Sequence, residues 1–149
     1  MADSTQDTLA HKRNVLDYAT DFCGALLERA KHHDDSKLES PEKEKFDLVG
    51  TKSHLSKSEY GSEEYKKSLE MLGDALKHHY EANSHHPQHY PDGIDGMDLL
   101  DVVEMYVDWK AAAERNKDGD LAKSIEMNRE RFKMSDQLYH IFKNTVGKF

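Results

Sequence analysis

The chain has 149 residues, with 29 acidic and 21 basic side chains, so its formal net charge is −8. This length is typical of one domain, and an acidic chain without a basic cluster argues against nucleic-acid binding. No apolar run reaches the ~20 residues of a membrane-spanning helix, and the N-terminus MADSTQDT lacks the apolar segment of a signal peptide. The single cysteine, Cys23, excludes an internal disulfide. We therefore expect a cytoplasmic protein that binds neither nucleic acid nor membrane.

Apolar residues recur at spacings of three and four along most of the chain, which predicts one all-α domain of six or seven helices over residues 1–149. We expect the first six residues to be disordered. In chain order, helices are predicted over residues 7–22, 25–37, from 40–41 onward, 62–83, 97–116, 120–131 and 135–145. Polar loops are predicted over residues 50–61 and over 84–96, where the second loop has two prolines and two glycines.

Gly24 is the only glycine among residues 7–37, and glycine commonly ends helices. If the chain folds back there, an antiparallel helix pair brings His11 level with His33. One continuous helix would instead separate these two histidines by ~33 Å, at ~1.5 Å per residue. We therefore predict a break between Thr20 and Gly24 and one metal ion shared by His11 and His33.

Histidine is unusually frequent, with ten residues of which six form three adjacent pairs. His33 and Asp34 together offer a neutral nitrogen and an anionic oxygen to a divalent cation. Lys37 follows Asp34 by three residues, where its ammonium group can bind a phosphate oxygen. The alternative interpretation is a helix that simply ends in polar residues.

The predicted helix over 62–83 carries an apolar stripe that becomes polar at its end. Its members are Tyr65, Leu69, Leu72, Leu76, His79 and Asn83. A buried histidine needs a partner, so His79 is either a core histidine bonded to a carbonyl or a metal ligand. His85 and His86 follow in a loop whose prolines can direct them back, which favours the metal. We prefer His86 as a ligand and expect His85 to face substrate or solvent; alternatively, both imidazoles only pin the loop to the next helix.

The predicted helix over 97–116 is apolar around most of its circumference, yet Asp101, Glu104 and Asp108 lie along one ridge. Carboxylates on a buried helix must be paired, hydrated or metal-bound. The alternative is that this ridge faces solvent. For Asp101 the sequence supports the two interpretations equally, whereas for Asp108 it favours the buried one. We predict that Asp108 faces inward and meets His79 across the site.

In order, His11, the His33-Asp34 pair and Asp108 resemble the motif of the HD-domain superfamily of metal-dependent phosphohydrolases. Longer segments are similar to a small HD-like family of phages and bacteria, namely HHDDSK, HHYEANSHHPQHY, DLLDVVEMYVDWKA and NRERFKMSDQLYHIFKNT. Three features depart from the superfamily. The spacing from His11 to His33 is shorter than in most HD domains, Ser36 replaces the usual small glycine, and the histidine-rich segment lacks the glycine-rich signature of cyclic-dinucleotide phosphodiesterases.

The resemblance implies an HD-like fold with His11, His33, Asp34 and Asp108 as primary metal ligands. It also implies that His79, with one or both of His85 and His86, holds a second metal ion or the substrate. One or two divalent ions are expected, and the sequence does not distinguish Mn, Mg, Zn and Fe.

The expected function is hydrolysis of a small phosphorylated molecule, such as a nucleotide, by metal-activated water. Lys37 would offset phosphate charge, Glu104 would help to orient the water, and Asn83 would contact substrate or brace a ligand. We expect a monomer or homodimer, in a bacterial host if the chain is phage-encoded. The alternatives are a dinuclear iron oxygenase of the HD-like type, a non-catalytic phage protein that binds a metal or nucleotide, and a helical protein with surface histidines.

Overall fold

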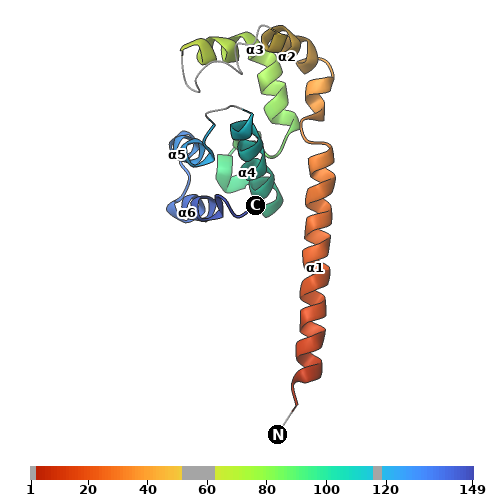
Figure 1. Ribbon diagram of the computed structural model, residues 1–149. Helices are drawn as coiled ribbons and strands as arrows, with labels where there is room; N and C mark the ends of the chain where they lie inside the picture. Colours follow the sequence, from red (N-terminus) through yellow and green to blue (C-terminus); the bar gives the residue numbers. More distant parts are fainter. Residues whose placement is uncertain (1–2, 52–62, 116–118) are drawn as a thin grey trace. The chain divides into compact units, whose positions relative to one another are not determined.

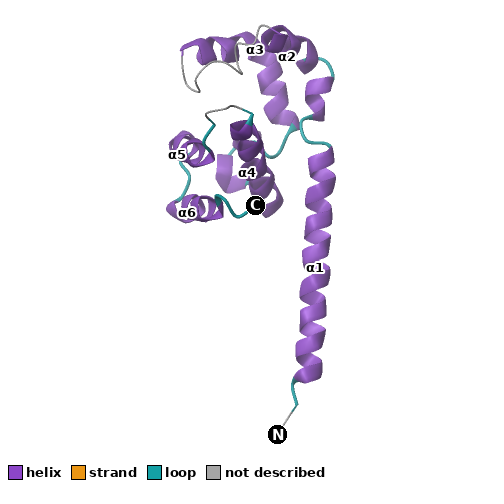
Figure 2. Ribbon diagram, in the orientation of Figure 1, coloured by secondary structure: helices purple, strands orange, loops and turns teal. Residues whose placement is uncertain are grey.

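The computed structural model describes residues 3–51, 63–115 and 119–149. Every regular element in these ranges is a helix, as Figure 2 shows, which confirms the predicted all-α fold class. The chain divides into two units, Met1–His33 and Asp34–Phe149. None of the described helices combines the length and the apolar character that a membrane span requires.

The first unit is built on one continuous helix, α1, from Thr5 to Lys31 (Figure 1). The predicted break between Thr20 and Gly24 is therefore wrong. A helical glycine costs only ~1 kcal/mol relative to alanine, and Gly24 is followed by the good helix formers of ALLERA. At ~1.5 Å per residue, His11 lies ~30 Å from Lys31, so His11 and His33 do not share an ion within one chain.

The second unit begins with a short 3-10 turn, η1 (Asp35–Leu38), which precedes α2 (Glu42–Thr51) and α3 (Glu63–Ala82). α2 starts at Glu42, one residue after the predicted start at residues 40–41, and α3 covers most of the predicted helix over 62–83. The predicted loop over 50–61 lies outside the described residues except at its first two positions, which end α2. α2 and α3 pack against each other.

A kink divides α3 at Gly73, whose backbone angles are φ 42° and ψ −116°. Side chains strongly disfavour this conformation, whereas glycine adopts it readily. Around and after the kink, α3 buries Leu72, Ala75 and His79. The kink therefore directs the last turns of α3 and the histidines they carry.

The segment after α3 is a loop with two 3-10 turns, η2 (Pro87–His89) and η3 (Gly93–Gly96), in agreement with the predicted loop over 84–96. Asp101 connects this loop to α4 through hydrogen bonds. Its carboxylate accepts hydrogen bonds from Ser84 Oγ at 2.7 Å and Tyr90 OH at 2.5 Å, and it forms a capping box with Asp98. Asp101 is 1% exposed, so it is a paired structural carboxylate.

The main core of the second unit lies among α4 (Leu99–Glu114), α5 (Leu121–Arg131) and α6 (Asp136–Thr145). Figure 1 shows these three helices grouped together. The buried side chains are Met105, Tyr106, Trp109, Ile125, Met134, Tyr139 and Phe142. This packing holds α4 as a rigid support for the carboxylates that it presents.

Candidate metal centre

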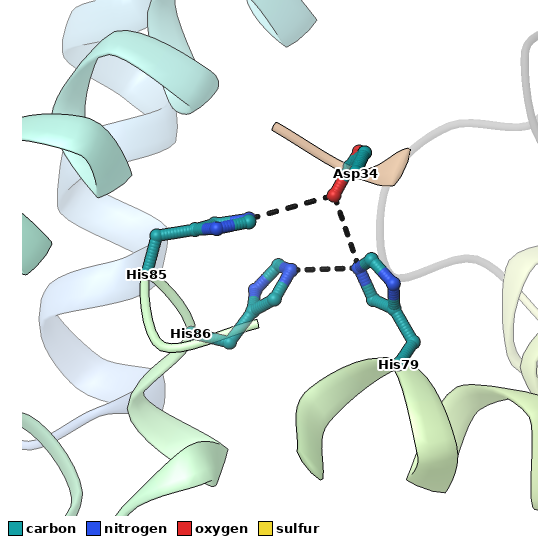
Figure 3. Close-up of side chains that lie close together, drawn as sticks. All are labelled: Asp34, His79, His85 and His86. Atoms are coloured by element: carbon teal, nitrogen blue, oxygen red, sulfur yellow. Dashed lines mark hydrogen bonds and ion pairs between the residues drawn. The ribbon is translucent and has the colours of Figure 1, made fainter. Parts of the chain in front are cut away.

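Four side chains of the second unit converge at one point: Asp34, His79, His85 and His86 (Figure 3). Each offers one donor atom, and these four atoms all lie within 4.8 Å of one another. Asp34 directly precedes η1, His79 lies in the last turn of α3, and the two other histidines begin the following loop. The fold thus brings Asp34 to the end of α3 and to the loop that directly follows it.

The donor atoms lie close enough together to be ligands of one metal ion. His79 Nε2 and His85 Nε2 lie 3.4 Å and 3.6 Å from Asp34 Oδ1, and the Nε2 atoms of His79 and His86 are 2.8 Å apart. Ligand atoms around tetrahedral zinc are about 3.3 Å apart, given bonds of about 2.0–2.1 Å. Three imidazoles and one carboxylate are also a donor set that transition metals prefer. The residues present therefore fit a metal ion.

Asp34 takes up its place through an unusual backbone conformation. Its φ of 62° lies in the left-handed region, which aspartate tolerates better than most residues. Lys37 Nζ donates to Asp34 Oδ2 at 2.5 Å, while Oδ1 is the oxygen that faces the imidazoles. The Lys37 ammonium also lies 5.2 Å from the centre of the Phe46 ring. Lys37 thus neutralises a carboxylate of the cluster, and its binding of substrate stays a prediction.

His79 and His86 sit where the protonated form is disfavoured. Burial is the main cause of a lowered pKa for His79, followed by the positive charge of Lys37. Burial lowers the pKa of His86 to about 3, with further contributions from His85 and His79. Neutral imidazole is the form that binds metals, so the surroundings of both rings favour the protonation state that coordination requires.

His85 does not face solvent, because only 2% of it is exposed. Its Nδ1 lies 3.3 Å from Glu104 Oε1, on α4, and its Nε2 faces Asp34. Its ring also packs on His86, with centroids 4.1 Å apart. The structure therefore brings both loop histidines into the cluster, whereas the sequence favoured His86 as the ligand. Glu104 lies behind His85, in the position of a residue that orients a ligand.

The other predicted site residues take different places. Asp108 is half-buried, and a carboxylate oxygen lies within 4.8 Å of a ring nitrogen of His85. Asp108 does not belong to the cluster of four donors that contains His79. Asn83 Nδ2 donates to Ser36 Oγ and to the carbonyl of His79, each at 2.8 Å, which agrees with the bracing role. His11 and His33 belong to the first unit, and a metal-binding role for His33 stays a prediction.

Sequence reasoning missed Glu42, the first residue of α2. Its side chain is fully buried, and its carboxylate contacts the Nδ1 atoms of His78 and His79 at 2.7 Å and 2.9 Å. In the sequence it stands in the charged run EKEK, which looks like an exposed helix start. No local pattern distinguishes it from Glu44, because its burial depends on contacts with α3.

A family model described as "Family of unknown function (DUF5662)" matches residues 1–148. The chain belongs to this family. No curated protein and no solved structure matches the chain. The cluster itself therefore has to support any functional proposal, and the likeness to HD-domain proteins stays a prediction.

Proposed function

We propose that Asp34, His79, His85 and His86 bind one divalent transition-metal ion and that the protein uses it to hydrolyse a small phosphoester, such as a nucleotide. The observation that carries the proposal is the convergence of four donor atoms within 4.8 Å. Imidazole suits zinc, copper, iron and nickel, whereas magnesium and calcium prefer oxygen ligands. Three imidazoles thus favour a transition metal over magnesium.

The number of protein donors bears on whether the centre is catalytic. Four donors fill a tetrahedral zinc ion completely, which is the pattern of structural sites. Around an octahedral ion the same four donors leave two positions, enough for a water molecule and a substrate oxygen. The hydrolase proposal thus favours manganese or ferrous iron, and the second candidate, a non-catalytic metal-binding protein, favours zinc.

When bound, such an ion lowers the pKa of a coordinated water toward ~7 and polarises a phosphoryl oxygen. The chain supplies the remaining elements of the proposed reaction. Asp34 offsets the positive charge of the ion, and Lys37, with its side chain 35% exposed, provides a cation beside the cluster. A phosphate group that binds there would meet the Lys37 ammonium, which accounts for attraction to an anion despite the net charge of −8.

Elemental analysis of the untagged chain, followed by a phosphate-release assay over a panel of nucleotides, tests the proposal. We expect one transition-metal ion per chain and release of phosphate in the presence of manganese or iron. His79→Ala should lose the ion, whereas His140→Ala, a substitution of an exposed histidine on α6, should keep it.

Three results would contradict the proposal in different ways. Wild-type protein without metal, or equal metal content in His79→Ala, would reject the centre. Bound zinc without phosphate release would reject the hydrolase and support the non-catalytic candidate. Oxygen consumption by an iron-loaded protein, again without phosphate release, would support an oxygenase.

A further inference from the structure

We infer that Glu42 is the positioning residue of the metal centre: it fixes the proton of His79 on Nδ1 and thereby directs Nε2 at the metal. The inference rests on the proposed metal centre and assigns a role to a residue outside the four donors. Glu42 comes from α2, an element that contributes no ligand. Three features support this role, namely its burial, the hydrogen bonds around it and the segments that it joins.

The Glu42 side chain is 0% exposed, and three groups surround its carboxylate. His78 Nδ1 lies 2.7 Å from Oε1, while His79 Nδ1 and Ser36 Oγ lie 2.9 Å and 3.1 Å from Oε2. A buried carboxylate is costly unless it is paired and hydrogen-bonded, and an ionised carboxylate only accepts hydrogen bonds. All three neighbours therefore have to donate to it.

The neighbouring polar groups support a proton on Nδ1 of His79. Asn83 Nδ2 also lies 3.1 Å from this atom, which would suit an unprotonated nitrogen. However, the amide group has two protons, and both are used in the bonds to Ser36 Oγ and to the carbonyl of His79. The Ser36 hydroxyl donates to Glu42. No donor remains for Nδ1 in this set, so His79 itself donates to Glu42.

A proton on Nδ1 leaves the lone pair of His79 on Nε2. That atom lies 3.4 Å from Asp34 Oδ1 and 2.8 Å from His86 Nε2, at the centre of the cluster. Carboxylates that accept a hydrogen bond from the second ring nitrogen commonly fix the tautomer and orientation of metal-binding histidines. Glu42 occupies this position for His79.

Glu42 also holds three segments together. Ser36 belongs to the turn that follows Asp34, His79 and Asn83 belong to the end of α3, and Glu42 itself begins α2. The bonds from Asn83 to Ser36 and from Ser36 to Glu42 close a ring through His79. Loss of the Glu42 carboxylate should thus affect both the ring of His79 and the place of Asp34.

Glu42→Gln tests this role in the full-length chain, with Glu44→Gln as the matched control on the same helix. Glutamine keeps the shape of the side chain, but it replaces one of the two accepting oxygens with an NH2 donor. Because His78 and His79 lie at different oxygens of Glu42, glutamine in the same place cannot accept from both imidazoles. Cobalt(II) is the probe, and its affinity is measured by competition with a chelator. We expect a 10–100-fold loss of affinity for Glu42→Gln and no change for Glu44→Gln.

Nitrogen-15 NMR of the histidine rings in the metal-free wild-type chain distinguishes a positioning role of Glu42 from a merely structural one, because only the positioning role determines which ring nitrogen of His79 carries the proton. We expect His79 to carry its proton on Nδ1 in the wild type and to populate the other tautomer in Glu42→Gln. A wild-type proton on Nε2, or wild-type affinity for cobalt in a folded Glu42→Gln, would overturn the inference.

Two further measurements separate this inference from the proposed metal centre. If Glu42→Gln does not fold, Glu42→Asp retains the charge but shortens the reach, and we expect the same loss of affinity; wild-type affinity would count against the inference. If wild-type protein binds no cobalt, the proposed centre fails, while the NMR assignment of the His79 proton still decides the role of Glu42.

Discussion

Asp34 is the one anionic donor of the cluster, so its charge should dominate metal affinity. An asparagine at this position would keep the shape and the tolerance for a positive φ, because asparagine also adopts the left-handed conformation. We expect Asp34→Asn to reduce metal affinity by more than the about 10–100-fold that is typical of residues that only orient a ligand, and to leave the helical content, measured by circular dichroism, unchanged. The exposed neighbour Asp35 supplies the control Asp35→Asn. Full affinity in Asp34→Asn would reject Asp34 as a ligand.

Glu104 should act on the centre through His85 rather than through direct coordination. The 3.3 Å separation between Glu104 Oε1 and His85 Nδ1 places the carboxylate behind the ligand. We expect Glu104→Gln to weaken metal binding 10–100-fold without changing the stoichiometry, as measured by titration. Glu114→Gln, at the exposed end of the same helix, should bind like the wild type. A changed stoichiometry would instead make Glu104 a ligand.

At the scale of elements, Gly24 and Gly73 have opposite roles. Added methyl groups meet no atoms within 4 Å at either position, so only the backbone conformation decides the effect. Gly24 is helical, whereas Gly73 has a φ of 42°. We expect Gly73→Ala to destabilise the protein by about 1–3 kcal/mol, measured by urea denaturation. Gly24→Ala should stabilise α1 by about 0.4–1 kcal/mol, measured by hydrogen exchange of the α1 amides. Changes in stability of the same sign and size for Gly73→Ala and Gly24→Ala would contradict this prediction.

The two glycines also show what the sequence predicts about elements. Apolar spacing is a local property, so it placed the helices of the second unit within a few residues of their observed bounds. A glycine, by contrast, indicates only that a break is permitted. The break expected at Gly24 does not occur, while the kink at Gly73 went unpredicted because it interrupts no apolar stripe.

The candidate site also has one part that the sequence predicts and one part that it does not. The stripe that ends at His79 predicted an inward-facing histidine, because its neighbours along α3 are apolar, and this histidine is buried. Glu42 was beyond prediction, since a charged residue at the start of a helix is usually exposed. Its burial arises from the packing of α2 on α3, which is a long-range contact.

At the scale of the whole molecule, the metal should link segments of the second unit that are distant in sequence. An ion that binds only the folded state, at 100 times its Kd, adds about 2.7 kcal/mol to the free energy of unfolding. We therefore expect manganese or zinc to raise the melting temperature of the chelator-treated wild type and, at the same ion concentration, to raise that of Asp34→Asn much less. Hydrogen exchange should slow most near Asp34, at the end of α3 and in the loop over residues 84–98. Slowing confined to α6, which carries no donor, would place the ion elsewhere.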